Sequence, residues 1–179
     1  MNSYDIYLES LKMTCTICRF TKQDAPRITQ LINKSNQFNL TTIRRNQSDI
    51  IKIMEDTNHY SFTCRLEDKF GDYGLVSVII LKIENSSLII DTWLMSCRVL
   101  KRQLEEVVMN EIHSIADRLG IKIIVGEYFP TKKNTLVKNL LTDMGMKVSK
   151  HTKRSVQCTI NVDAFKNFKT KIKVVQNDK

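Results

Sequence analysis

The chain has 179 residues, of which 42% are hydrophobic and 26% charged, and its formal net charge is +9. With only two prolines and five glycines, this composition is typical of one ordered domain, which we expect to cover residues 1–179. No window approaches the ~20 uninterrupted apolar residues of a membrane-spanning helix, and residues 1–9 carry neither a basic start nor an apolar signal core. The sequence therefore disfavours membrane insertion and secretion.

The five cysteines are an odd number in a chain without an export signal. They predict reduced, buried thiols and a cytoplasmic protein. Cys15 and Cys18 have the spacing of a redox or metal-binding pair, but on a strand such side chains point to opposite faces, and no second pair completes a zinc site. We expect no metal site.

The positive charge is concentrated at the end of the chain. Residues 147–179 hold nine Lys and Arg against two Asp and Glu, which accounts for +7 of the +9. Such a basic segment is typical of a protein that meets an anionic partner, or of a solvated edge strand followed by a basic tail. Only Phe165 and Phe168 offer aromatic stacking within the segment, so nucleic-acid binding is disfavoured.

Hydrophobic patterning in the first third predicts one strand and two helices. A short strand is expected at Cys15–Phe20, followed by a helix that Asp24 caps. The polar, aperiodic stretch Asn36–Arg45 predicts a loop. After it, Ser48 is expected to cap a short helix that reaches Met54.

Three strands are expected next, at Tyr60–Leu66, Tyr73–Ile83 and Ser87–Leu94. The turn-like residues 67–72 join the first two strands, and Asn85-Ser86 joins the second to the third. The spacing predicts an antiparallel meander.

The strongest helical pattern covers Leu104–Leu119, with Gly120 placed to end it in the left-handed conformation. A buried strand at Ile121–Glu127, a helix capped by Asn134 that ends before Gly145, and a closing strand at Val156–Val162 complete the order. This order predicts an α+β or α/β fold with a mixed, mainly antiparallel sheet and helices on both faces.

The element order, with a loop that leads from the third meander strand into the long helix, resembles the GNAT (acyl-CoA N-acyltransferase) fold. Four sequence blocks in the same order further resemble the C-terminal GNAT-like domain of FkbH-like proteins, and the resemblance covers about Tyr7 to Met146. The four blocks are Asn33–Thr42, Phe70–Val76, Asp91–Leu100 and Gly126–Asn134.

In that family a haloacid-dehalogenase-type phosphatase domain precedes the GNAT-like domain, and the proteins load a glyceryl unit onto an acyl carrier protein in polyketide-type pathways. The sequence contains no Asp-x-Asp-x-Thr phosphatase motif, so we do not expect the phosphatase step here. The resemblance implies an acyl carrier protein as a partner and a separate haloacid-dehalogenase-type protein as a second one.

The resemblance also implies a cofactor site at the turn before the long helix. There, backbone N–H groups and the helix dipole face the phosphates of acetyl-CoA, another acyl-CoA or a phosphopantetheine arm. The family pattern has small residues where this chain has Lys101 and Gln103, so the alternative is an ordinary helix start with solvated basic residues. The expected cofactor-binding residues are Leu94, Met95, Ser96, Arg98, Val99, Leu100, Lys101, Arg102, Gln103 and Asn134.

The residues for chemistry follow from the same resemblance. In many GNAT enzymes an Asn is followed seven residues later by a Tyr that protonates the leaving thiolate. Asn134 matches the first position and Leu141 occupies the second, so another acid or water would have to act. Asp91 and Glu127 are the candidate bases, with a structural role as the alternative for both.

The loop after the first helix is expected to line the acceptor side, with a loop bonded to itself as the alternative. Its candidate substrate-binding residues are Asn36, Gln37, Asn39 and Thr41.

Three functions are compatible with these features. The first is an acyltransferase-like protein that binds acyl-CoA or carrier-bound phosphopantetheine and moves a small acyl group. The second is a non-catalytic module that docks a carrier protein for a separate partner, with a basic tail that complements an acidic carrier. The third, a nucleic-acid-binding protein, has only the tail in its favour. The fold order and the four blocks favour the first.

Overall fold

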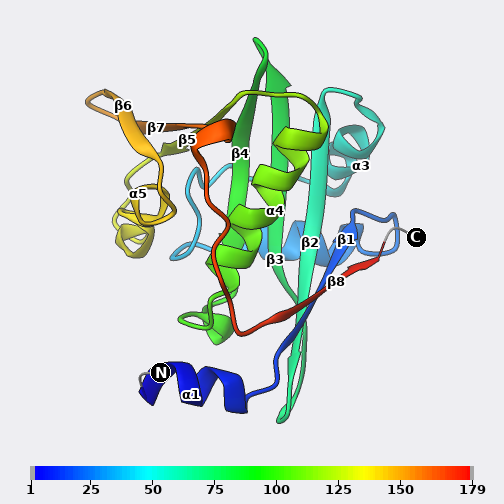
Figure 1. Cartoon of the computed structure of the whole chain (residues 1–179). Coiled ribbons are helices and arrows are strands. Elements are labelled where there is room, and N and C mark those ends of the chain that lie inside the picture. Colours follow the sequence, from blue (N-terminus) through cyan, green and yellow to red (C-terminus); the bar gives the residue numbers. More distant parts are fainter. Residues whose placement is uncertain (1–2, 178–179) are drawn as a thin grey trace.

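The computed structural model describes residues 3–177. Its strands form one eight-stranded sheet in the order β6-β7-β5-β4-β3-β2-β1-β8 (Figure 1). Only the β1–β8 and β4–β5 pairs are parallel, so the predicted mixed, mainly antiparallel sheet is confirmed. The strands are β1 Thr14–Arg19, β2 His59–Asp68, β3 Gly71–Glu84, β4 Ser87–Met95, β5 Ile123–Tyr128, β6 Lys147–His151, β7 Val156–Asn161 and β8 Lys173–Asn177.

Helices cover both faces of the sheet, as predicted. One apolar cluster joins α2 and α3 to the sheet, and a larger one joins α1, α4 and α5 to the other face. Trp93 belongs to the larger cluster and Leu94 to the smaller, because successive side chains of a strand point to opposite faces. The helices are α1 Ser3–Ser10, α2 Ala25–Lys34, α3 Gln47–Glu55, α4 Leu104–Arg118 and α5 Leu140–Asp143, with 3-10 turns η1 Cys97–Val99, η2 Thr135–Val137 and η3 Val162–Ala164.

A β-bulge and an early end of pairing separate β4 from β5. Ile80 of β3 faces Thr92 and Leu81 faces Ile90, so Asp91 is the extra residue of β4. β4 pairs with β5 only from Ser87 to Ile90, although β4 continues to Met95 and β5 to Tyr128. Because the two strands are parallel, their carboxyl ends diverge at one edge and leave a split between them.

Two helix starts differ from the prediction. α3 begins at Gln47, because Asn46 forms a reciprocal capping box with Asp49, so the expected cap at Ser48 is wrong. The helix expected from Asn134 is a short 3-10 turn, and α5 begins only at Leu140.

Asp24 does precede α2, but its side chain does not cap the helix. It accepts hydrogen bonds from Thr21 and, at 2.7 Å, from the Arg65 guanidinium. The helix therefore begins where expected, without the expected cap.

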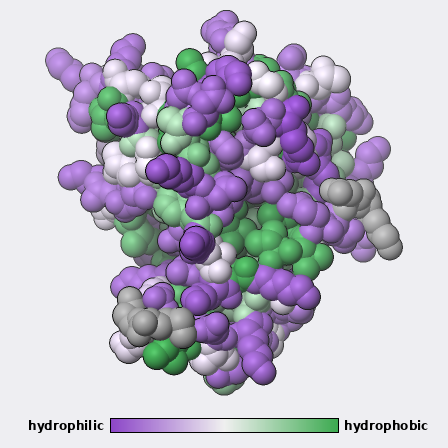
Figure 2. Space-filling model, viewed as in Figure 1, coloured by the Kyte–Doolittle hydropathy of each residue, from purple (hydrophilic) through white to green (hydrophobic). Residues whose placement is uncertain are grey.

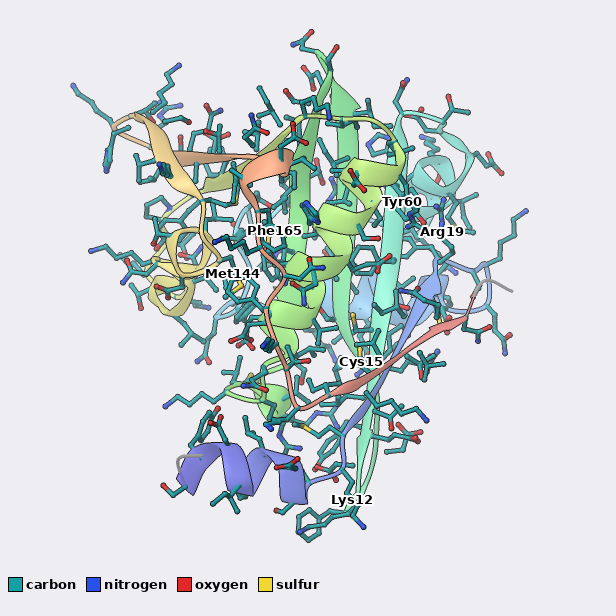
Figure 3. The ribbon with its side chains drawn as sticks, viewed as in Figure 1. Lys12, Cys15, Arg19, Tyr60, Met144 and Phe165 are labelled. Carbon is teal, nitrogen blue, oxygen red and sulfur yellow. The ribbon has the colours of Figure 1, made fainter. Side chains whose placement is uncertain are left out.

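Three elements were not predicted: α1, β6 and β8. Within the basic segment, β8 returns across the molecule and pairs with β1 at the far edge of the sheet (Figure 1). Figure 2 shows hydrophilic side chains over most of the same face, with hydrophobic ones gathered between α4 and β8. Near this edge the Arg19 guanidinium lies 3.7 Å from the centre of the Tyr60 ring (Figure 3).

Between residues 3 and 177, no helix is both long and apolar enough to cross a membrane. The five cysteines all have free thiols. No three His, Cys, Asp or Glu side chains gather within this range in a way that could hold a metal ion.

Candidate functional site

A segment of the chain itself lies in the split between β4 and β5. The Leu40 N–H donates to the Trp93 carbonyl at 3.3 Å, and the Met95 N–H donates to the Phe38 carbonyl at 3.1 Å. On the other side, the Phe129 N–H donates to the Leu40 carbonyl at 3.0 Å. Phe38–Leu40 therefore acts as a short strand that links β4 to the end of β5.

The Asn134 side chain holds this segment in place through hydrogen bonds. Its side chain is fully buried and donates to the Asn39 and Phe129 carbonyls, each at 3.0 Å. Its amide oxygen accepts from the Thr131 N–H at 2.7 Å. The whole amide thus bonds to protein, and its predicted cofactor contact stays a prediction.

One cavity, of about 660 Å³, lies on the α2 side of the split. We call it the basic cavity, because three lysines line it and no Asp or Glu does. Lys34 comes from the last turn of α2, while Lys132 and Lys133 come from the loop after β5. Met95, Ser96 and the exposed thiol of Cys97 bring the end of β4 to the same cavity.

A second cavity, of about 430 Å³, lies between the start of α4 and α5. We call it the acidic cavity, because Glu105, Glu106 and Asp143 line it with a single cation, Lys101. Figure 3 shows Met144, another lining residue, on the side of α5 that faces α4.

Phe38 lines both cavities. Its side chain is only 5% exposed, and its ring centre lies 6.4 Å from that of Trp93. Both cavities therefore reach Phe38, one from the α2 side and the other from the start of α4.

The turn before α4 has the backbone that its sequence pattern suggested. Lys101 has φ of 58° and Gln103 has φ of 66°, a left-handed conformation that glycine adopts most easily. These are the two positions at which the resemblance led us to expect small residues. The Gln103 side chain also accepts a hydrogen bond from the Lys171 N–H at 2.8 Å, so this residue has a structural task as well.

A carboxyl group of the protein lies beside the backbone donors of this turn. Burial raises the pKa of Glu105 to about 7, although the backbone N–H groups of Glu105 and Lys101 act in the opposite direction. Burial also raises the pKa of Glu106. A carboxyl group that is close to half protonated at neutral pH therefore lies where a phosphate was expected.

Tyr4 closes the acidic cavity from α1, an element that the sequence pattern did not reveal. Its hydroxyl donates to the Lys101 carbonyl. Burial raises the pKa of this hydroxyl, and the carboxylates of Glu106 and Glu105 raise it further. The phenol is therefore protonated at neutral pH.

The predicted cofactor-binding residues are divided between several places. Leu100, Lys101 and Gln103 line the acidic cavity, whereas Met95 and Ser96 line the basic one. The remaining members lie outside both cavities. Leu94 and Val99 are buried in the core, Arg98 reaches the Tyr73 carbonyl at 3.3 Å, and Arg102 pairs with Asp68 at 2.5 Å.

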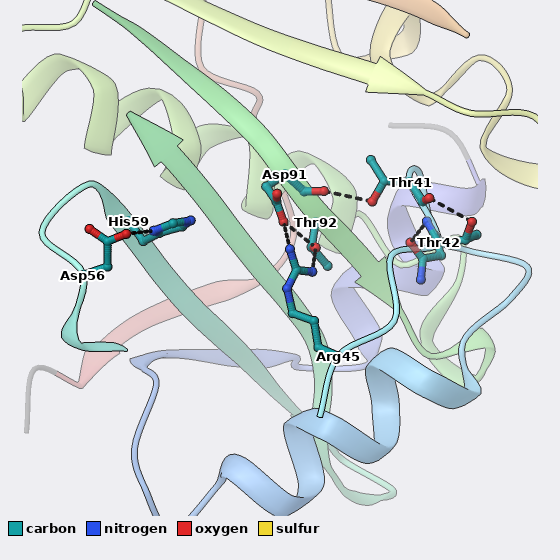
Figure 4. Close-up of polar contacts among 8 residues, drawn as sticks. Thr41, Thr42, Arg45, Asp56, His59, Asp91 and Thr92 are labelled. Atoms are coloured by element: carbon teal, nitrogen blue, oxygen red, sulfur yellow. Dashed lines mark hydrogen bonds and ion pairs between the residues drawn. The ribbon is translucent and has the colours of Figure 1, made fainter. Parts of the chain in front are cut away.

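The candidate bases line neither cavity. Asp91 accepts from the Arg45 guanidinium at 2.5 Å and from the Thr92 hydroxyl at 2.9 Å (Figure 4). Glu127 accepts from the Ser155 hydroxyl at 2.6 Å and faces a different depression. Their catalytic roles stay predictions, and the geometry favours a structural role for Asp91. Arg45 was missed because it lies 46 residues from its partner.

The predicted acceptor loop divides in the same way. Asn36 and Gln37 line the basic cavity. The Asn39 side chain donates to the Ser35 carbonyl at 3.1 Å and accepts from the Thr42 N–H at 2.9 Å. The Thr41 hydroxyl donates to the Asp91 carbonyl of β4 at 2.8 Å (Figure 4). The alternative of a loop bonded to itself therefore describes Asn39, whereas Thr41 ties the loop to β4.

Leu141 packs against the sheet and lines neither the acidic nor the basic cavity. A Cβ atom added at Gly126 of β5 would lie 2.7 Å from the Leu141 Cδ2, so the two residues fit together closely. Tyr4 is the tyrosine that the acidic cavity contains.

No protein-family model matches the sequence, and no curated protein matches it. Solved structures do match its fold. The PaiA N-acetyltransferase of Thermoplasma acidophilum in complex with coenzyme A has a TM-score of 0.66 at 12% identity, over 83% of this chain and 99% of that one. The spermidine N-acetyltransferase of Vibrio cholerae with CoA and spermine has a TM-score of 0.62 at 13% identity, over 84% and 96%. The chain therefore has the GNAT acetyltransferase fold, as predicted.

Proposed function

We propose that the protein is a GNAT-type acyltransferase that takes a small acyl group from acyl-CoA, or from a phosphopantetheine arm, and passes it to an acceptor. One observation carries the proposal: two cavities, one beside α2 and one between α4 and α5, share Phe38 in their linings. A donor in one cavity and an acceptor in the other would bring a thioester and a nucleophile together at that ring. The N-acetyltransferases of similar fold, which were solved with CoA, support the donor class.

The acidic cavity is the donor side of the proposal. Its left-handed turn and the start of the 15-residue helix α4 direct backbone N–H groups and the positive end of a helix dipole toward a ligand. Lys101 adds a cation there. A phosphate at these donors would lie beside the Glu105 carboxyl group, and protonation of that group near its pKa of about 7 removes the repulsion between the two.

Proton transfer to the departing thiolate needs an acid that Leu141 cannot provide. The protonated phenol of Tyr4 lines the donor cavity and supplies it in this proposal. The N–H or O–H nucleophile of the acceptor attacks the thioester carbonyl, the carbon–sulfur bond breaks, and the sulfur gains the phenol proton. The proton that the nucleophile loses returns to the Tyr4 phenolate through water.

The finer assignment, to the FkbH-like proteins, rests on the four sequence blocks. Under it, the donor is an acyl carrier protein, and a separate haloacid-dehalogenase-type protein prepares the acyl group. The basic segment 147–179 would complement the acidic surface of a carrier.

A second candidate, a non-catalytic docking module, is favoured by two observations. Phe38–Leu40 already pairs with the edge of β4 that an extended amide chain would use. The Glu105 carboxyl group already lies beside the backbone N–H groups of the turn. In this case the protein would bind a carrier protein but not CoA.

Calorimetric titration with acetyl-CoA, and in parallel with holo and apo carrier protein, tests the proposal. Lys101→Ala removes the cation of the donor cavity, and Lys150→Ala, on the exposed strand β6, is the matched control. Micromolar acetyl-CoA binding that falls about tenfold in Lys101→Ala alone supports a working donor site. Carrier binding without CoA binding favours the docking module, and binding of neither ligand refutes both.

A further inference from the structure

The two cavities that share Phe38 in their linings carry opposite charge. Lys34, Lys132 and Lys133 line the basic cavity, and a smaller cavity of about 370 Å³ adjoins it, sharing Lys132 and Lys133 and adding Arg44. No Asp or Glu lines either of these two spaces. The acidic cavity has three carboxylates and one lysine. The protein thus places opposite charges in two cavities that share a lining residue.

The lysines of the basic cavity are not neutralised by the protein. Within residues 3–177, no ion pair involves Lys34, Lys132 or Lys133. Like charges around one space repel, and an anion placed between them removes that repulsion and gains Coulomb attraction to each. The charge pattern therefore selects for a negative ligand.

The loop that carries Lys132 and Lys133 is held by hydrogen bonds within the protein. Asn134 accepts from the Thr131 N–H, and the Lys133 N–H donates to the Thr131 hydroxyl at 3.2 Å. Arg44, which lines the adjoining smaller cavity, donates to the Ile32 carbonyl and to the Asn36 side chain. An anion therefore binds to backbone that is already ordered, so binding costs less conformational entropy than binding to a mobile loop would.

We propose that the basic cavity binds an anionic group, a phosphoryl or a carboxylate, of the acceptor molecule. The acceptor role rests on the proposed acyltransferase function, whereas the anion site rests on the charges and the ordered backbone alone. Lys34, Lys132 and Lys133 would surround the anion, and the Asn36 and Gln37 amides in the same lining would hold the rest of a small polar molecule.

Titration of nitrogen-15-labelled protein with pyrophosphate and, separately, with citrate tests the site by amide chemical shifts. Glycerol is the uncharged control. We expect saturable shifts in Ser35–Phe38 and Thr131–Lys133, and the tighter of the two ions identifies the phosphoryl or carboxylate source. The double variant Lys132→Ala/Lys133→Ala should weaken binding about tenfold, while Lys147→Ala/Lys150→Ala removes the same charge from exposed β6 and should not.

Equal weakening by both double variants would show diffuse attraction to a basic protein and would overturn the proposal, as would the absence of saturable binding by either ion. The titration contains no acyl-CoA, so its outcome is independent of the donor site. Anion binding without acetyl-CoA binding would leave the site and remove the acyltransferase. Acetyl-CoA binding that is lost in Lys132→Ala/Lys133→Ala but kept in Lys101→Ala would place the donor in the basic cavity and overturn the assignment to the acceptor.

Discussion

Replacement of Asn134 by alanine should destabilise the protein strongly, because this one buried amide joins three segments around the split. It makes two hydrogen bonds to carbonyls at 3.0 Å and accepts from the Thr131 N–H at 2.7 Å and hydroxyl at 3.0 Å. Each such bond contributes about 1 kcal/mol, and partners left buried without one add to the loss. We expect the free energy of unfolding to fall by about 3–4 kcal/mol.

Urea unfolding followed by circular dichroism measures this change, with Asn139→Ala as the matched control. Asn139 is exposed at the start of α5, and its side chain forms no cap hydrogen bond. Its loss should change stability by about 0.5 kcal/mol or less. A loss below about 1 kcal/mol for Asn134→Ala would refute the view that its amide holds the Phe38–Leu40 segment in the split.

Three further changes test neighbouring parts of the account. Lys101→Gly should raise the free energy of unfolding in urea melts by up to about 1 kcal/mol, because it relieves the strain of a left-handed φ. The control Lys132→Gly, at a residue without a left-handed φ, should lower the free energy of unfolding by about 0.5 kcal/mol. Equal effects of the two variants would contradict the strain at Lys101. Glu105 has a pKa raised from 4.5 to about 7, so the folded state binds its proton more tightly and stability should fall as pH rises from 4.5 to about 7. Thermal melts of Glu105→Gln should lack this fall. The same pH profile in the variant as in the unchanged protein would exclude Glu105 as its cause. Asp91→Ala should lower the free energy of unfolding by about 2 kcal/mol, because it leaves Arg45 without its carboxylate partner. A double-mutant cycle with Arg45→Ala should show a coupling energy of about 1 kcal/mol between the two residues. Additive losses would mean that the pair is not coupled.

Local patterns were sufficient for the central elements. The three- and four-residue spacing in the long helix placed α4, and Gly120 ends it with φ of 68°. The turn between β3 and β4 is made by Asn85 and Ser86, both with positive φ, as a type I′ hairpin turn requires. At these positions the residue types in the sequence predict the backbone conformation that the structure has.

The missed elements carry weak side-chain signals. Every residue of β6 and β8 is exposed, so neither strand has an alternating apolar pattern, and backbone pairing alone places it at the edge of the sheet. α1 buries only Leu8. The periodicity of apolar residues in the sequence reveals the helices and strands that cover the core, and it does not reveal those that bury few side chains.

Only part of the candidate site could be predicted from the sequence. The pattern located the turn at Lys101 and Gln103, because its small-residue positions mark a backbone conformation. It could not locate the pairing of Phe38–Leu40 with β4, which joins residues more than 50 positions apart through backbone groups. Glu105 offered a usable signal, since an acidic residue in the first turn of a helix favours the N-terminal donors.

The most direct test of the account is where a donor binds. Hydrogen–deuterium exchange of the full chain, with and without saturating acetyl-CoA, reports this by segment. We expect slower exchange in Lys101–Glu106 and Leu136–Met144, the two walls of the acidic cavity. Protection confined to the loops that carry Lys34, Lys132 and Lys133, or no protection anywhere, would contradict it.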